Sequence, residues 1–118
     1  MTPRRWRFYR TAAGRSPVQD FLATLDLADA AAVAAAMRDV AQDGLVAARH
    51  LRGDIYEVRA SGDRQAFRVL FANEGRRGQI LLALEAFSKK TQRTPAPQVE
   101  LAERRLADWR ARGRLSHP

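Results

Sequence analysis

Residues 51–95 contain three short runs in which apolar and polar side chains alternate. Alternation with a period of two places every second side chain on the same face, so each run predicts a β-strand. We expect these strands near residues 55–60, 66–72 and 79–87. The turns between them are short and contain glycine, at residues 61–63 and 73–75, so neighbouring strands should pair antiparallel.

The register of the first two strands follows from the need for one apolar face. Pairing Arg59 with Arg68 places the valines and aromatic residues of both runs together on the opposite face. Two arginines directly opposite each other are destabilising unless a partner compensates. Glu57, Glu85 or a phosphate of a ligand could provide that compensation.

The segments that flank these strands predict three helices and one more strand. Residues 5–9 alternate and predict an opening strand, whereas Ser16-Pro17 and Asp26 mark the starts of two helices in a hairpin. Gly44 is suited to end the second helix, and Thr94-Pro95 opens the last one. The order predicts an α+β fold with an antiparallel-rich sheet of about four strands, an N-terminal helical hairpin and a C-terminal helix.

The length predicts a single domain over residues 1–118. Residues 45–53 are expected to form a connection, and residues 113–118 a frayed tail. There is no cysteine and no apolar run of the length that a membrane span needs, and the basic N-terminus lacks the apolar region of a signal peptide. We therefore expect a cytoplasmic protein without a membrane partner.

Positive charge is concentrated outside residues 16–48. That segment has five acidic residues and one basic residue, whereas the rest of the chain has twenty basic and eight acidic residues. Segregation of this kind is the electrostatic footprint of nucleic-acid binding. With Arg59 and Arg68 on one face of the sheet and a basic cluster at 89–93, the chain is expected to bind polyphosphate, most simply RNA.

Three motifs in the predicted strands resemble those of one protein family. The motifs are I-Y-E-V-R at residues 55–59, F-R-V-L-F at residues 67–71 and F-S-K-K-T-Q-R-T-P at residues 87–95. They are similar to the motifs of the phage-derived, HigB-like branch of the RelE/ParE toxin superfamily. The resemblance extends over about the whole chain, and the K-K-T-Q-R-T-P motif is its most specific part.

This resemblance implies a small RelE-like fold and the toxin of a type II toxin–antitoxin system. Related toxins enter the ribosomal A site and cleave messenger RNA, so the implied activity is that of a ribosome-dependent mRNA endonuclease. In this metal-independent chemistry the 2′-hydroxyl of the substrate attacks the adjacent phosphate and gives a cyclic phosphate. The implied partners are a cognate helix-turn-helix antitoxin, the ribosome and messenger RNA.

The resemblance and the residue types together predict the site. Arginine suits a developing phosphorane because its planar fork binds two oxygens. The expected catalytic residues are Arg68, Lys90 and Glu85, and the expected RNA-binding residues are Arg59, Lys89 and Arg93. The alternative for the two arginines is a cross-strand ion pair with a neighbouring glutamate, and for the lysines a solvated surface.

The general base is the least defined part of this site. Many relatives have a histidine where this chain has Glu85, and a carboxylate there could act as a base or pair with an arginine. His50, in the segment expected to be a loop, is more simply incidental. Tyr9 breaks the alternation of its run and is a candidate for stacking on RNA bases. Metal-ligand spacings and Gly-rich phosphate loops are lacking, so neither a metal nor a cofactor is expected.

Two other functions remain open at this point. Relatives with this fold that lack the catalytic cations poison DNA gyrase without cutting nucleic acid. The chain could also be an inactive descendant that serves as an antitoxin-binding or regulatory module. The combination of Arg68 with Lys89 and Lys90 favours the nuclease.

Overall fold

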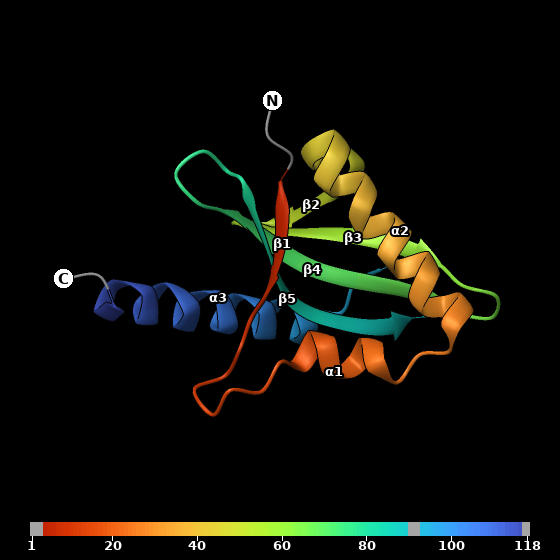
Figure 1. The fold of residues 1–118 in the computed structure, drawn as a ribbon, viewed down its shortest axis with the longest axis horizontal. Coiled ribbons are helices and arrows are strands. Elements are labelled where there is room, and N and C mark those ends of the chain that lie inside the picture. Colours follow the sequence, from red (N-terminus) through yellow and green to blue (C-terminus); the bar gives the residue numbers. More distant parts are fainter. Residues whose placement is uncertain (1–3, 90–92, 117–118) are drawn as a thin grey trace.

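The computed structural model describes residues 4–89 and 93–116, which form five strands and three α-helices around one sheet (Figure 1). The strands and helices, with one short 3-10 turn, follow in the order β1 (Arg5–Phe8), α1 (Pro17–Ala23), α2 (Leu27–Asp43), a 3-10 turn (Gly44–Ala47), β2 (Arg49–Arg52), β3 (Ile55–Ser61), β4 (Ala66–Glu74), β5 (Ile80–Lys89) and α3 (Ala96–Ser116). This confirms the α+β class, the N-terminal helical hairpin and the C-terminal helix.

The sheet has the strand order β1-β5-β4-β3-β2. Only β1 pairs in parallel, with β5, and the other neighbours are antiparallel. The expected number of about four strands was one too low, because part of the predicted connection at 45–53 is the edge strand β2. Strand β2 has a single aliphatic residue, Leu51, so its sequence has no alternation, and it is defined by its pairing with β3.

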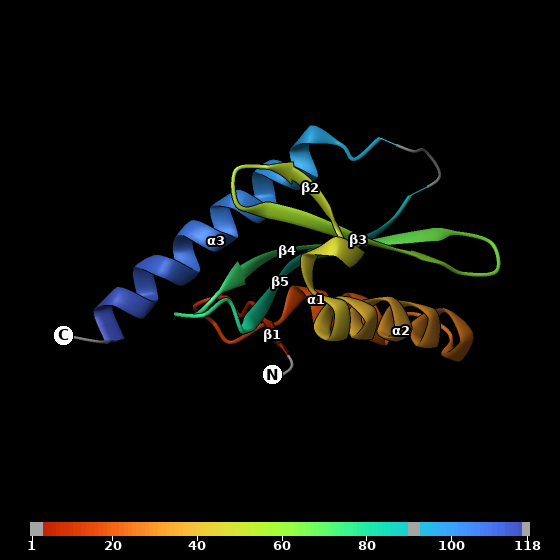
Figure 2. The same ribbon diagram turned by 90° about the horizontal axis from the view of Figure 1, so that it is seen from above.

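The helices form two layers, one on each face of the sheet. Figure 2 shows α1 and α2 together on one side and α3 crossing the other side. Both hairpin helices begin at the expected residues, and α2 ends at the expected glycine. The Asp26 carboxylate accepts a hydrogen bond from the Asp29 amide at 2.8 Å, and Gly44 ends α2 with a φ of 82°, a conformation that favours glycine.

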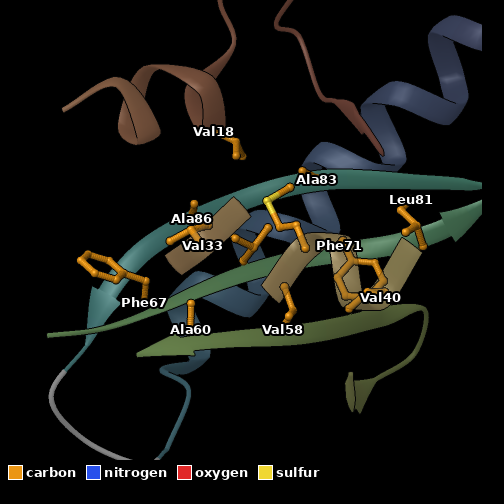
Figure 3. Packing of buried hydrophobic residues seen from close by; sticks show 12 residues of the cluster. Val18, Val33, Val40, Val58, Ala60, Phe67, Phe71, Leu81, Ala83 and Ala86 are labelled. Atoms are coloured by element: carbon orange, nitrogen blue, oxygen red, sulfur yellow. The ribbon is translucent and has the colours of Figure 1, made fainter. Parts of the chain in front are cut away.

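Each face of the sheet carries its own apolar core. On the hairpin face, Val33 and Val40 of α2 belong to one cluster of buried side chains with Phe71 of β4, which Figure 3 draws. On the other face, α3 packs an apolar stripe onto β4 and β5; its buried members are Val99, Ala102 and Leu106. Strand β5 contributes to both cores because its side chains alternate between them.

The register of β3 and β4 is the predicted one. Arg59 pairs with Arg68, and Val58 pairs with Val69 on the apolar face. Helix α3 extends to Ser116 and so includes residues 113–116 of the predicted tail. Within the described ranges, no helix combines the length and the apolar character that crossing a membrane requires.

Candidate nucleic-acid interface

A basic cleft lies between the edge strand β2, the neighbouring strand β3 and the beginning of α3. Its volume is about 320 Å³. The residues that line it are Arg49, Leu51, Arg52, Arg59, Arg93, Thr94, Ala96 and Val99. Four of these eight are arginines and none is acidic, so the cleft concentrates positive charge at one corner of the sheet. We refer to it as the β2 cleft.

A buried carboxylate lies beside the arginines of the β2 cleft. Glu57 of β3 is 1% exposed, and its Oε1 accepts a hydrogen bond from Nε of Arg59 at 2.6 Å. Its Oε2 accepts a hydrogen bond from the hydroxyl of Thr94 and lies 3.6 Å from Nη1 of Arg68. The negative charge of Glu57 therefore offsets the repulsion between Arg59 and Arg68, as their pairing requires. Glu85 does not take this role.

Arg68 lies beneath the β2 cleft and does not line it. Its side chain is 3% exposed, and its Nη1 donates a hydrogen bond to the Thr94 hydroxyl at 3.0 Å. Burial lowers the pKa of Arg68, and the nearby carboxylate of Glu57 opposes that shift. A phosphate could touch Arg68 only if the groups that cover it moved aside.

The other expected site residues are distributed unevenly. Arg59 and Arg93 both line the β2 cleft, and the side chain of Arg59 is 33% exposed. Lys89 is half-buried at the end of β5 and is not among the lining residues. Lys90 lies outside the described residues. The structure thus brings two of the predicted RNA-binding residues together.

Glu85 makes contacts with α3 instead of with the β2 cleft. Its Oε1 lies 3.3 Å from Nη1 of Arg105, and the same Nη1 donates to the carbonyl of Leu84 at 2.7 Å. This is the arginine pairing that the sequence offered as the alternative to a role as base. Among the residues that the structure describes, no group of three His, Cys, Asp or Glu side chains is placed to hold a metal ion.

The structure changes the expected environments of Tyr9 and His50. Tyr9 was expected to be a candidate for base stacking, but it is 6% exposed and its hydroxyl donates to Oδ2 of Asp108 at 2.6 Å. Burial and this hydrogen bond raise the pKa of Tyr9. His50 lies in strand β2 and not in a loop, and its Nε2 is 2.8 Å from the carbonyl of Gly53.

Sequence reasoning missed Arg49 and Arg52 of β2 and the hydroxyl of Thr94 as parts of the site. The two arginines lie at the ends of a four-residue segment without an alternating pattern, so the sequence does not predict that this segment pairs with β3. A weak signal existed for Thr94, because it lies within the K-K-T-Q-R-T-P motif. Glu57 was identified as a possible partner of the arginines, and the structure adds that it also holds Thr94.

Comparison with known proteins gives consistent matches. Residues 20–107 match the family described as "Phage derived protein Gp49-like". The chain is 35% identical over 108 residues to a Mycobacterium tuberculosis protein named "Probable endoribonuclease HigB1", in strain CDC 1551 / Oshkosh and likewise in strain H37Rv. Each alignment covers 89% of this chain and 84% of the relative.

Proposed function

The chain belongs to the phage-derived Gp49-like family of RelE/HigB-type toxins, and on that premise we propose that it is the toxin of a type II toxin–antitoxin pair that cleaves messenger RNA. The relatives named as probable endoribonucleases support the activity. The observation that carries the proposal is the β2 cleft, in which four arginines meet at one corner of the sheet without an acidic lining residue. A phosphate backbone is the ligand that such a cleft fits.

The reaction assigned to this cleft is an internal transfer of phosphate. The 2′-oxygen of the RNA forms a bond to the adjacent phosphorus, the bond to the 5′-oxygen of the next nucleotide breaks, and the proton lost by the first oxygen is matched by one gained at the second. Arg59 and Arg93 would bind the non-bridging oxygens and stabilise the charge that develops on them. Lys89 and Lys90 would bind flanking phosphates.

Glu57 supports this role by fixing the direction of Arg59. With Nε of Arg59 held at 2.6 Å by the buried carboxylate, the guanidinium keeps a fixed direction at the β2 cleft, which Arg59 lines. Arg68 stays a prediction as a phosphate-stabilising cation, because its burial places it behind Thr94 and Glu57. Glu85 stays a prediction as a base, and its pairing with Arg105 argues for a structural role.

Dependence on the ribosome is the second part of the proposal. His50 bonds the carbonyl of Gly53, and Glu85 bonds Arg105, so neither is poised in the β2 cleft as an acid or base. Positioning by a large partner can supply much of the rate that a well-placed base would give. We therefore expect cleavage only of messages that are being translated.

The test uses the purified chain, ribosomes programmed with a defined message, and primer extension to locate the cuts. Arg59→Ala should lower the cleavage rate about 10²–10³-fold because a contact to the developing charge is lost. Arg59→Lys should lie between this variant and the unaltered protein, since the charge stays and the fork is lost. Arg76→Ala is the matched control, because Arg76 is exposed in the β4–β5 turn and lines no part of the cleft.

Several outcomes would contradict the proposal. Efficient cutting of naked RNA would remove the dependence on the ribosome. Arrest of growth with intact messages and blocked replication would instead indicate a gyrase poison. For Arg68, unfolding in urea must be measured beside cleavage. If Arg68→Ala melts early but still cleaves at low temperature, Arg68 is a structural ion-pair residue.

A toxin of this kind needs a partner that restrains it, and we propose a cognate antitoxin that covers the β2 cleft or makes the complex too large for the ribosome. The field of twenty basic residues outside 16–48 favours a partner with acidic side chains. Hydrogen exchange on the complex tests the first version. Protection confined to α1 and α2, with β2, β3 and α3 unchanged, would contradict direct coverage.

A further inference from the structure

A second basic cleft lies at the opposite edge of the sheet, where β1 meets the C-terminal half of α3. Its volume is about 370 Å³. The residues that line it are Trp6, Arg7, Phe8, Arg10, Trp109 and Arg112. Three of these are arginines and the other three are aromatic, and none is acidic. We refer to it as the β1 cleft; none of its lining residues belongs to the β2 cleft.

The positive charges of the β1 cleft are not all compensated by ion pairs within the protein. Arg112 is 2.8 Å from Oδ2 of Asp108 and donates to the carbonyl of Arg10, so its charge is partly compensated. Arg10 donates to the neutral carbonyl of Gly14 at 3.3 Å. Arg7 is exposed and has no ion-pair partner within residues 4–89 and 93–116. Two cationic groups therefore remain available to an anion.

The aromatic residues distinguish this cleft from a simple charged surface. Trp109 is half-buried on α3, and its inner edge packs against the core beneath that helix. The ring of Trp6 lies on the hairpin face, where it packs against Phe71 and donates its indole N–H to the carbonyl of Met37 at 2.7 Å, so Trp109 is the indole of this cleft. An indole ring beside arginine is the combination on which single-stranded nucleic acids stack their bases while their phosphates are neutralised.

The two clefts are linked by one helix. Ala96 lines the β2 cleft and Trp109 lines the β1 cleft, thirteen positions further along α3. At a rise of 1.5 Å per residue these positions are separated by about 20 Å along the helix. Helix α3 thus connects a cleft with four arginines to a cleft with three arginines and the indole of Trp109.

We propose that the β1 cleft is a second binding site for single-stranded RNA, with a base stacked on Trp109 and phosphates bound by Arg7 and Arg10. An acidic polypeptide would meet the same charges but would gain little from the indole, because a carboxylate has no π-face. RNA uses both features of the cleft. This site goes beyond cleavage in the β2 cleft and does not depend on it.

The test is binding of a fluorescent ten-nucleotide 2′-O-methyl oligoadenylate to the full chain, followed by anisotropy at several salt concentrations. The blocked 2′-oxygen cannot attack phosphate, so binding is measured without cleavage. Arg7→Ala combined with Arg10→Ala should lower the slope of log affinity against log salt by about 1.4, at about 0.7 per phosphate contact. Arg76→Ala combined with Arg77→Ala removes the same charge from an exposed turn and should leave the slope near its original value.

Stacking is tested separately. Trp109→Ala should weaken binding about fivefold to 150-fold, the equivalent of about 1–3 kcal/mol for one stacked base, and Trp109→Phe should restore most of it. Since Trp6 and Trp109 are the two tryptophans of the chain, Trp6→Phe leaves Trp109 as the single reporter, and the oligonucleotide should quench its fluorescence. That quenching should persist in an Arg49→Ala, Arg59→Ala background, which weakens the β2 cleft.

Any of three results would overturn the proposal. One is an unchanged salt slope in the Arg7, Arg10 variant together with unquenched Trp109. Another is binding of polyglutamate that depends on Arg7 and Arg10 while the oligonucleotide binds independently of them, which would assign the cleft to an acidic polypeptide. Loss of quenching in the Arg49, Arg59 background alone would place the RNA in the β2 cleft only.

Discussion

The two faces of the sheet are built from the same strands but differ in what they bury. The hairpin face is apolar throughout its core, from Val58 and Val69 to Phe71. The α3 face is apolar under the helix, yet beside the helix N-terminus it buries the charged side chains of Glu57 and Arg68. Charged side chains are almost never fully buried unless they are paired. Their presence on one face alone distinguishes that corner, where we propose the RNA site, from the rest of the sheet.

The difference follows from how much of the sheet each layer covers. Two helices cover the hairpin face, whereas α3 crosses the other face from the β2 edge to the β1 edge (Figure 2). The two basic clefts lie at the two ends of that crossing. A buried ion pair is weak evidence for stability, because desolvation offsets its attraction. We infer that the network under the β2 cleft is retained because it holds cations in a fixed geometry.

The largest expected effect comes from removing the buried carboxylate. Glu57→Ala should lower the free energy of unfolding by about 3–5 kcal/mol, because Arg59 and Arg68 are then opposite each other without compensation. Urea unfolding of the purified variant measures this loss. Glu57→Gln keeps the shape and one acceptor oxygen but removes the charge, so it separates the loss of charge from the loss of packing. A loss below about 1 kcal/mol for Glu57→Ala would mean that water screens this corner and that it is not a buried network.

A matched pair of substitutions compares the two apolar cores directly. Leu81 and Leu82 are neighbours on β5, both 0% exposed, and they point to the hairpin face and the α3 face respectively. Leu81→Ala and Leu82→Ala should each cost about 2–5 kcal/mol of unfolding free energy, because each leaves a cavity in a packed core. Calorimetry or urea unfolding gives both values. If Leu82→Ala were nearly neutral, α3 would be loosely attached and the comparison would fail.

The smallest expected effect concerns the attachment of α3 at acidic pH. The hydrogen bond from Tyr9, together with Arg112, lowers the pKa of Asp108. Its contribution is therefore present above the unfolded value of about 3.9 and is lost as the pH falls through the folded value. Asp108→Asn should reduce the loss of stability between pH 5.5 and pH 3. An identical loss in the variant and the unaltered protein would show that Asp108 does not hold α3.

Much of this protein was determined by local sequence patterns. Alternation predicted β3, β4 and β5, and the need for one apolar face predicted the pairing of Arg59 with Arg68. Pro17, Asp26 and Gly44 marked the helix ends because capping and φ preferences act within a few residues. Membership of the toxin family was also readable, from motifs that lie within single strands.

Only the tertiary structure determined which arginines line the β2 cleft and which are buried. Strand β2 exists because β3 offers it an edge, and that pairing brings Arg49 and Arg52 to Arg59. Arg68 is buried beneath that cleft, and Glu85 pairs with Arg105 of α3. The physical reason is that an alternating strand determines which face a side chain takes, whereas the covering of that face depends on contacts between distant segments. The sequence identified Arg59, Arg68 and Arg93, and contacts between distant segments determined that Arg59 and Arg93 line the β2 cleft while Arg68 is buried.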